Sequence, residues 1–296
     1  MLDVHRLRLL RELDRRGTLA AVAKALNYSP SAISQQLSLL ETETGATLLE
    51  HVGRGVRLTP QARILVRHAD AILERLELAE AELATSMTEV TGTIRVASFQ
   101  SVLLALVPGA LSGLVAAHPG LRIRVTQLEA GPAFAGLLAH EFDVVLGEEY
   151  PGLAQPRNPG VDEEDLVHDE IRMAVPVDGP WHQGDLAELN GAPFVFDPGD
   201  IEPGQWARTQ CRSAGFEPDV RFVSGDLLLQ VRLVETGHAV AFLPDLLWTD
   251  RAHGRVELHP LPGRPRRRLF TAVRSGSAEQ PAIRAFRKAL QDQVRG

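Results

Sequence analysis

The sequence predicts an α/β protein in three consecutive parts: an N-terminal winged helix-turn-helix, a long linker helix, and an α/β domain of two subdomains. Three observations predict this fold class. Two short helical patterns meet at a tight turn near the N-terminus, an apolar seam with helical spacing follows, and residues 92–296 alternate between strand-like and helix-like segments. With 296 residues, 44% of them hydrophobic, the chain is long enough for more than one core.

Charge is distributed unevenly along the chain. The formal net charge of −7 argues against a general nucleic-acid binder. Residues 1–60 carry eight basic and six acidic side chains, residues 61–91 carry three and six, and residues 92–296 carry twenty and twenty-six. The first segment is therefore the only one of the three with a net positive charge.

Features that would direct the chain to a membrane or an oxidising compartment are missing. No apolar run approaches the roughly 18 residues that span a bilayer, and charges are scattered through the N-terminal MLDVHRLRLLREL. We therefore expect a cytoplasmic protein with no membrane partner. The single cysteine, Cys211, excludes an internal disulfide and a CxxC site, and we expect it to pack as a small residue on a helix.

The first two helices follow from spacing and capping residues. Leu7, Leu10 and Leu13 recur at helical spacing before Gly17, which suits a C-terminal cap. A second helix fits residues 18–26, with a threonine as N-cap and four alanines that allow close approach of a neighbouring helix.

The third helix lies in the stretch NYSPSAISQQL, residues 27–37. Ser29 is placed as its N-cap, and Pro30 occupies the first helical position, where the missing N–H costs nothing. The apolar face comprises Ile33, Leu37 and Leu40, and the polar face comprises Ser31, Ser34, Gln35 and Ser38. A helix, a tight turn and a second helix with a polar outer face is the arrangement whose second helix enters the major groove of DNA.

A hairpin is predicted after the third helix. TLLEHVGRGVRLT, residues 47–59, has two short apolar segments around Gly53-Arg54-Gly55, which places Arg54 at the tip of a wing. An arginine there suits the DNA backbone or the minor groove. On these residues alone, a small helical bundle with a solvated polar face remains an alternative.

The first sixty residues resemble the DNA-binding domain of LysR-type transcriptional regulators. The similarity runs through LAAVAKALNYSPSAISQQLSLLETETGATLLEHVGRGVRLTPQA, residues 19–62, and disfavours the bundle alternative. It implies double-stranded promoter DNA as a partner, with Ser31, Ser34 and Gln35 toward the base edges. The full set of expected DNA-binding residues is Ser29, Pro30, Ser31, Ser34, Gln35, Ser38, Arg54 and Arg57.

A long helix suited to pairing is predicted from Pro60 onward. An apolar seam with alternating spacings of three and four residues is formed by Ala62, Leu65, Ala69, Ile72, Leu76, Ala79 and Leu83. A single helix cannot bury such a seam, so the spacing predicts dimerisation. The alternative is one long helix that packs on its own C-terminal domain. The resemblance implies a dimerising linker helix here, and a homodimer or a tetramer built from dimers.

The remaining residues alternate between strand and helix. TIRVA, LRIRVTQLE and FDVVLGE read as strands separated by helices at residues 101–118 and 132–141, and a second set follows from IRMAVP to LFTAVRS. Repeated βαβ units predict a mostly parallel sheet with helices on both faces. The two halves resemble the effector-binding domain of LysR-type regulators, itself similar to periplasmic solute-binding proteins.

Domain boundaries follow from these segments. We expect a winged helix-turn-helix at residues 1–59, a coiled-coil linker helix at 60–91 and an effector-binding domain at 92–296. Within the last, subdomain I comprises residues 92–161 and 267–296, and subdomain II comprises residues 162–266. The chain would cross between the halves near Asp162 and return near Arg266.

Candidate effector-binding residues lie at predicted strand ends, because open α/β sheets bind ligands at the carboxyl ends of their strands. They are Ser98, Phe99, Gln100, Ser101, Glu129, Glu148, Glu149, Asp197, Ser224 and Phe242. Any one of them could instead be a solvated loop residue. The four carboxylates suggest a small-molecule effector with a cationic group, such as an amino acid or an amine, whose anionic or hydroxyl end lies near residues 98–101.

Other functions find little support in the sequence. No GxSxG elbow, HExxH pair, Walker loop or GxGxxG motif is present, and the ten histidines are dispersed, so we expect no enzyme, metal or cofactor. A small-molecule-binding protein of the periplasmic-binding type without a regulatory role is the alternative. RNA polymerase is a further expected partner. The cluster Arg264, Arg266, Arg267 and Arg268 is interpreted as a solvated connection before the last strand.

Overall fold

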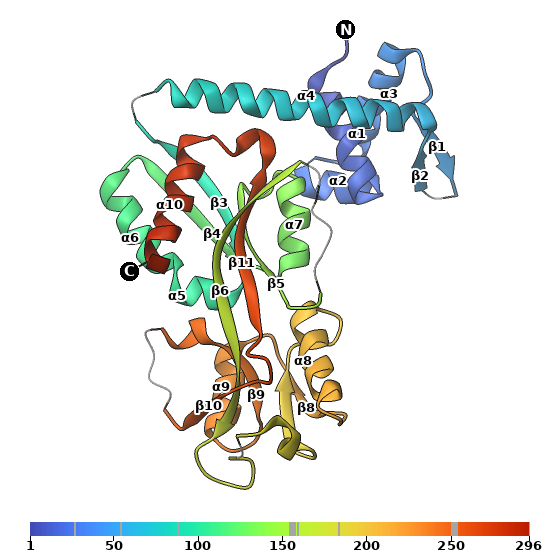
Figure 1. The fold of residues 1–296 in the computed structure, drawn as a ribbon. Helices are drawn as coiled ribbons and strands as arrows, with labels where there is room; N and C mark the ends of the chain where they lie inside the picture. Colours follow the sequence, from blue (N-terminus) through green and yellow to red (C-terminus); the bar gives the residue numbers. More distant parts are fainter. Residues whose placement is uncertain are drawn as a thin grey trace. The chain divides into compact units, whose positions relative to one another are not determined.

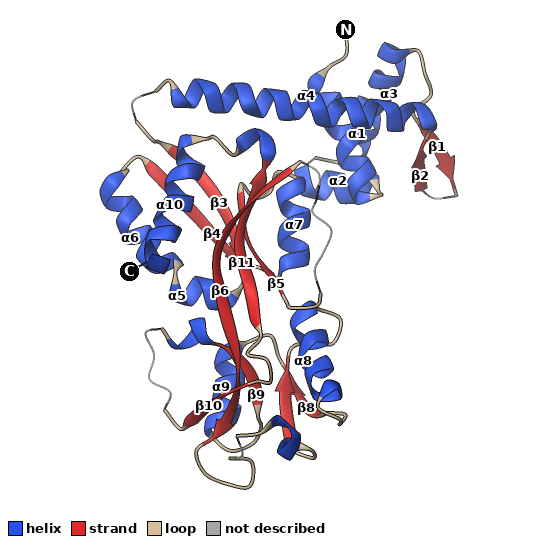
Figure 2. Ribbon diagram, in the orientation of Figure 1, coloured by secondary structure: helices blue, strands red, loops and turns tan. Residues whose placement is uncertain are grey.

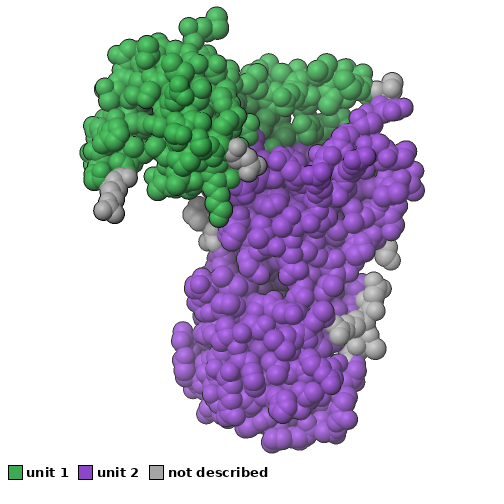
Figure 3. Space-filling model, turned by 180° about the vertical axis from the view of Figure 1, so that it is seen from behind, with its two compact units in different colours: residues 1–88, 274–281 green, residues 89–273, 282–296 purple. Residues whose placement is uncertain are grey.

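The computed structural model describes residues 1–26, 28–53, 55–87, 89–153, 158, 160–182, 184–249 and 254–295. The chain forms two compact units, one comprising Met1–Thr88 with Arg274–Pro281 and the other Glu89–Val273 with Ala282–Gly296 (Figure 3). Each unit is described by itself. No helix in the described ranges is long and apolar enough to cross a membrane.

The first unit begins with three helices, α1 (Val4–Arg16), α2 (Leu19–Leu26) and α3 (Pro30–Thr44) (Figure 1). Gly17 ends α1 in the left-handed region at φ 74°, a conformation that glycine adopts without strain. Ser29 caps α3, because its side chain accepts a hydrogen bond of 3.2 Å from the Ala32 amide. The predicted apolar face of α3 is confirmed: Ile33, Leu37 and Leu40 are buried in the core of the first unit.

The predicted wing is also present. β1 (Leu49–Val52) and β2 (Gly55–Leu58) form an antiparallel pair in which Glu50 lies opposite Arg57. Glu41 on α3 fixes the start of this hairpin, since its Oε1 atom accepts hydrogen bonds from the amides of Leu48 (2.7 Å) and Leu49 (3.1 Å). Arg54, the predicted tip residue, lies outside the described residues.

The long helix α4 (Pro60–Thr85) divides the predicted seam into two parts. Ala62 and Ala69 are buried and Leu65 packs partly buried in the core of their own unit. The second part of the seam is exposed, and it comprises Ile72, Leu76, Ala79 and Leu83. The first half of α4 therefore packs in the core formed by the N-terminal helices, which neither the predicted pairing nor the alternative of packing on the C-terminal domain describes. The second half leaves an apolar face without a partner in the described chain.

The segment after the last strand packs on α4 within the same unit. Arg274 Nε donates to Glu77 Oε1 over 2.6 Å, and the pair is largely buried. At Gly276, in the short helix η3 (Ser275–Ser277), an added Cβ would lie 2.6 Å from the Glu74 carbonyl oxygen. Only glycine permits so close an approach of this segment to the helix.

The second unit is built on a seven-stranded sheet of order β10-β6-β11-β5-β3-β4, with β9 pairing with β6 (Figure 2). A separate parallel pair joins β7 to β8. The strand bounds are β3 (Gly92–Ser98), β4 (Leu121–Gln127), β5 (Val144–Glu149), β6 (Val161–Pro176), β7 (Pro193–Phe196), β8 (Asp219–Val223), β9 (Ala241–Pro244), β10 (Val256–Pro260) and β11 (Arg266–Arg274).

The sheet is mixed, which corrects the prediction of a mostly parallel sheet. β3 runs parallel to β4 and β5, whereas β11 runs antiparallel to β5, and β9 and β10 run antiparallel to β6. The antiparallel pairs arise because β6 and β11 are the two strands by which the chain leaves the first half and returns to it. They lie side by side through the unit (Figure 1).

Six helices in the described residues cover these strands: α5 (Gln100–Ala105), α6 (Val107–Ala117), α7 (Ala130–Leu138), α8 (Glu202–Ser213), α9 (Leu227–Glu235) and α10 (Pro281–Arg295). The single helix predicted for residues 101–118 is two helices, since Pro108 lacks an N–H and cannot continue α5. The predicted packing of Cys211 on a helix is confirmed, because it is buried on α8.

Candidate ligand cavity and nucleic-acid interface

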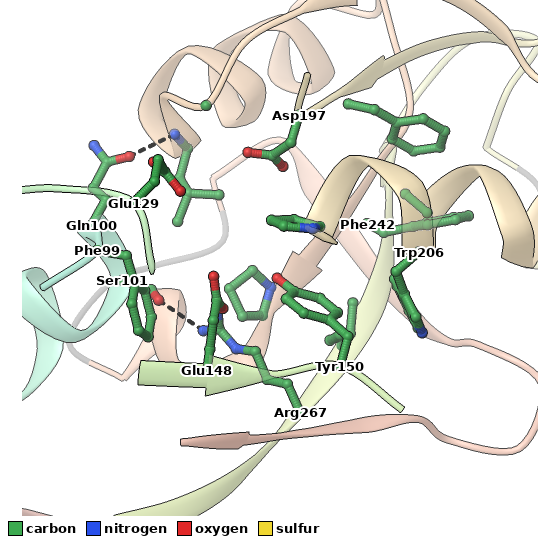
Figure 4. A pocket seen from close by; sticks show the side chains of 17 residues that line it. Phe99, Gln100, Ser101, Glu129, Glu148, Tyr150, Asp197, Trp206, Phe242 and Arg267 are labelled. Carbon is green, nitrogen blue, oxygen red and sulfur yellow. Dashed lines mark hydrogen bonds and ion pairs between the residues drawn. The ribbon is translucent and has the colours of Figure 1, made fainter. Parts of the chain in front are cut away.

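A cavity lies in the second unit, where the strand ends of its first half meet strands and helices of its second half. Its empty volume, which includes space open to solvent, is about 580 Å³. The first half contributes Phe99, Gln100, Ser101, Glu129, Glu148 and Tyr150; the second half and β11 contribute Asp197, Trp206, Phe242 and Arg267 among others (Figure 4). We call this the inner cavity.

The floor of the inner cavity is an ion cluster around Arg267. This side chain is only 3% exposed, and its Nη1 donates to Glu148 Oε2 over 2.7 Å. Its Nη2 donates to Asp169 Oδ2 over 2.6 Å and to Ser101 Oγ over 2.7 Å. Burial acts to lower the pKa of Arg267, but the charges of Asp169 and Glu148 outweigh burial and raise it. Arg267 is therefore charged and fully engaged by the protein.

Two further carboxylates face the cavity. Asp197 follows β7 and Glu129 precedes α7, and both converge on Gly225, where an added Cβ would lie 3.6 Å from Asp197 Oδ1 and 3.8 Å from Glu129 Oε1. Figure 4 shows the two carboxylates on the same side of the cavity. Within the described residues neither has an ion-pair partner.

Burial and like charge make these carboxylates costly to ionise. Burial raises the pKa of Asp197 to about 6; the hydrogen bond from Gln230 Nε2 opposes this, and the charges of Glu148 and Glu129 add to it. Burial, followed by the charge of Glu148, also raises the pKa of Glu129. With a pKa of about 6, Asp197 is mostly ionised at neutral pH, and no ion-pair partner for it or for Glu129 lies among the described residues.

Aromatic rings also line the cavity. Ring centroids lie 5.5 Å apart for Tyr150 and Trp206, 6.2 Å apart for Trp206 and Phe242, and 5.1 Å apart for Phe196 and Phe242. Burial raises the pKa of Tyr150 well above its ordinary value, so its phenol stays neutral. Aromatic faces beside carboxylates form a typical environment for an organic cation.

Gln100 joins the two halves across the mouth of the cavity. Its Nε2 donates to Asp226 Oδ1 over 3.0 Å, and its Oε1 accepts a hydrogen bond of 2.7 Å from the Leu227 amide. Asp226 is the N-cap of α9, so the amide of Gln100 completes the capping of a helix in the other half. Gln100 therefore holds the halves together, in addition to lining the inner cavity.

The structure gathers most of the predicted effector-binding residues. Seven of the ten line the inner cavity: Phe99, Gln100, Ser101, Glu129, Glu148, Asp197 and Phe242. Glu149 lines the neighbouring hollow instead. Ser98 and Ser224 line neither: Ser98 is fully buried and its hydroxyl donates to the Phe99 carbonyl, while Ser224 Oγ accepts from the Asp226 amide.

The arginine cluster requires a correction. Arg267 and Arg268 are not part of a solvated connection, because β11 begins at Arg266 and alternation along the strand turns Arg267 inward. Arg267, Tyr150 and Trp206 were not among the predicted cavity residues. The signal that could have identified Arg267 is the strand that contains the apolar LFTAV, residues 269–273. Because alternate residues of a strand share a face, Arg267 lies on the same face as Leu269.

The polar face of α3 lies opposite its buried face. Ser31, Gln35 and Ser38 are exposed and Ser34 is partly exposed. Ser29 and Pro30 are exposed at the start of the helix, where Ser29 Oγ lies 3.0 Å from Ser31 Oγ. Arg57 on the wing is exposed and its Nη2 atom lies 2.8 Å from Glu50 Oε2 on the facing strand. Small and amide side chains thus form a surface that permits close approach to a groove.

Comparison with protein families supplies the deciding observation. Residues 88–295 match the model described as the LysR substrate binding domain, and residues 4–63 match the bacterial regulatory helix-turn-helix protein of the lysR family. The chain belongs to the LysR family. This LysR-family regulator is accordingly a DNA-binding transcriptional regulator with a C-terminal effector-binding domain, and the predicted fold class and family resemblance are confirmed.

Two relatives match over nearly the whole regulator. It is 26% identical over 276 residues to a probable hydrogen peroxide-inducible genes activator of Mycobacterium avium, covering 90% of this chain and 86% of the relative. It is 26% identical over 298 residues to the transcriptional regulator MetR of Salmonella typhimurium, covering 99% and 90%.

Solved structures share the fold at lower identity. Full-length OxyR from Pseudomonas aeruginosa superposes with a TM-score of 0.70 at 19% identity, covering 98% of this chain and 95% of that one. Full-length CbnR in complex with its target DNA has a TM-score of 0.55 at 21% identity, covering 99% and 100%. In the described part of the chain no group of three or more His, Cys, Asp or Glu residues is arranged to hold a metal ion.

Proposed function

We propose that this LysR-family regulator reads promoter DNA with the polar face of α3 and responds to an effector that carries a cationic group and binds in the inner cavity. The parts of the proposal follow the predicted divisions of the chain, with DNA contacts in residues 1–59, pairing through 60–91 and effector binding in 92–296. The observation that carries the effector assignment is the pair of carboxylates Asp197 and Glu129, which converge in a cavity lined by aromatic rings and have no ion-pair partner among the described residues.

The DNA contacts divide by chemistry. Ser31, Ser34 and Gln35 can donate to and accept from base edges, whereas Arg57, together with Arg54, would contact phosphates or the minor groove. Ser29 and Pro30 start the helix and Ser38 extends the polar face. Ser29 serves mainly as the helix cap.

Replacement of Gln35 by alanine is expected to relax sequence discrimination. A lost bidentate base contact costs about 1–3 kcal/mol at the contacted base pair, so affinity for the selected site should fall roughly 5- to 150-fold while affinity for random DNA is unchanged. The measurement is fluorescence anisotropy on a site selected from random DNA and on a scrambled site. Gln205→Ala, at an exposed glutamine of α8, is the matched control. Equal loss on both DNAs would refute the role of Gln35.

Pairing is proposed through the exposed part of the α4 seam. Ile72, Leu76, Ala79 and Leu83 form an apolar stripe that one chain leaves uncovered, and a second copy would bury it. One helix-turn-helix contacts few base pairs. Two copies related by symmetry therefore increase the affinity for the specific site relative to the affinity for non-specific DNA. The proposal is completed by three further points. The regulator forms a homodimer or a tetramer, it acts on DNA in the cytoplasm, and it contacts RNA polymerase.

The effector would act by shifting a population of states. The two halves would close on a ligand only if the ligand binds the closed state more tightly than the open state. The difference between these two affinities sets how far the equilibrium shifts, and with it how paired subunits sit on DNA. Gln100 supports this proposal, since it already bridges the halves at α9. The family membership favours this regulator over the alternative of a binding protein without a regulatory role.

Titration with simple ions is expected to show the sign of the effector charge. Butylamine should bind the full-length chain, measured by isothermal calorimetry, and succinate should not. Asp197→Asn should weaken butylamine binding roughly 10- to 100-fold, because a hydrogen bond to a charged group contributes about 1.5–3 kcal/mol. Glu217→Gln, at an exposed carboxylate that pairs with Arg212, controls for loss of one negative charge. Tight binding of succinate alone would overturn the assignment.

A further inference from the structure

A second hollow adjoins the inner cavity within the same unit. We call it the outer chamber; its open volume is about 1440 Å³, and it shares Glu129, Glu148 and Pro203 with the inner cavity. These shared lining residues make the two spaces neighbours. A ligand long enough to occupy both would pass along Glu129 and Glu148.

The outer chamber has an apolar floor. Phe134 on α7 and Phe270 on β11 lie with ring centroids 6.1 Å apart, and Ile201 and Pro203 continue the apolar lining at the start of α8. An apolar floor in a concave space suits the hydrocarbon part of a ligand. The hollow and its floor are the evidence for a ligand, and the charged residues around it indicate only the sign of the ligand charge.

Negative charge predominates around this floor. Six carboxylates line the chamber, contributed by Glu129, Glu148, Glu149, Glu163, Asp200 and Glu202, against one guanidinium, that of Arg268. Arg268 is already engaged: its Nε donates to Asp165 over 2.6 Å, its Nη1 donates to Glu163 over 3.1 Å, and it lies 4.3 Å from the Phe270 ring centroid. Among the described residues, no lining cation is therefore available to an anionic ligand group.

These observations discriminate between two cationic ligands. A zwitterionic amino acid with its ammonium group between Asp197 and Glu129 would place its carboxylate near residues 98–101, as the sequence suggested, or in the acidic outer chamber. Near residues 98–101 the neighbouring cation is Arg267, which Asp169, Glu148 and Ser101 already bind. Neither position therefore offers the carboxylate an ion pair that offsets its desolvation or repulsion. A second cation in the outer chamber meets carboxylates instead.

We propose that the effector is an elongated dication, of the diamine or polyamine class, with one ammonium group in the inner cavity and the other in the outer chamber, joined by an apolar chain over Phe134 and Phe270. The inference rests on the proposed function, because it assumes that the inner cavity takes a cation. It adds the second charge and the length of the ligand.

The test compares three probes with the same four-carbon chain, titrated calorimetrically into the full-length protein. Putrescine carries two ammonium groups, butylamine carries one, and γ-aminobutyrate carries one ammonium and one carboxylate. Putrescine is expected to bind roughly tenfold or more tightly than butylamine, beyond the twofold that two equivalent ends give statistically, and γ-aminobutyrate should bind least. A series of longer diamines, each paired with the monoamine of equal length, covers the span between the chambers.

A double variant separates the two chambers. Asp200→Asn combined with Glu202→Gln is expected to reduce putrescine binding to the level of butylamine and to leave butylamine binding as it is, while Glu217→Gln changes neither. If no diamine binds more tightly than its monoamine, the dication is refuted and a monocationic effector stands. If no amine binds and succinate does, the cationic effector of the proposed function is refuted as well.

Discussion

The Asp197→Asn variant is expected to be more stable than the wild-type protein when both are free of ligand at neutral pH. In the folded chain the pKa of Asp197 is raised from 3.8 to about 6, chiefly by burial, so ionising this carboxylate opposes folding. Each pH unit between the two values corresponds to about 1.4 kcal/mol, and partial exposure of the side chain reduces the total to on the order of 2 kcal/mol. Asparagine has a similar shape and no charge.

The effect has a defined pH window. Because the folded pKa lies above the unfolded pKa, the wild-type protein carries the full cost above about pH 6 and loses it as the pH falls toward 3.8. The advantage of the variant should therefore be greatest at neutral pH and vanish near pH 4. Thermal unfolding at a series of pH values measures it, with an expected rise of roughly 4–8 °C at neutral pH. A variant that is less stable than wild type at neutral pH would contradict this account.

The Arg267→Gln variant is expected to lose much of the stability of the effector domain. Removal of the guanidinium leaves Asp169 and Glu148 buried without their cation, and breaking a buried ion pair from one side costs about 3–5 kcal/mol. Arg267 also joins four elements, since its partners lie on α5, β5 and β6 while it lies on β11. The loss should appear as a lower denaturant midpoint in equilibrium unfolding.

One further variant shows whether the charge or the geometry of Arg267 stabilises the domain, and a second serves as a surface control. Arg267→Lys retains the charge but cannot bind Asp169 through two nitrogens, so we expect a midpoint between those of wild type and Arg267→Gln. Arg212→Gln, which removes an exposed arginine from a surface pair with Glu217, should leave the midpoint unchanged. Similar losses for Arg212→Gln and Arg267→Gln would show that the buried cluster has no special role.

The winged helix-turn-helix was predictable because its determinants are local. A cap such as Ser29 or Gly17 acts within one turn of its helix, and the spacing of Ile33, Leu37 and Leu40 defines the buried face without reference to other segments. Strand ends in the second unit were predictable for a related reason. Alternation of strand and helix identifies where each strand stops, and Asp197 and Glu129 follow from that position.

Other features depend on residues far apart in the sequence. The heptad seam of α4 does not reveal that Ala62 and Ala69 are buried in their own unit, because that depends on the packing of α1 and α4. The parallel or antiparallel direction of β11 depends on the route of the chain through β6, which local patterns do not record.

The sequence by itself determined the fold class, the reading helix and seven of the residues that line the inner cavity, because these follow from short-range capping, from periodicity and from strand ends. Only the tertiary structure decided which charges remain available. Arg267 reads as a surface arginine until Asp169, 98 residues away in the chain, is seen to bind it, and Asp197 and Glu129 read as ordinary acids until they converge on Gly225. Electrostatic interactions act through space, so the sequence could suggest an acidic site from its carboxylates, but only the folded chain shows which of these carboxylates already have a counter-charge.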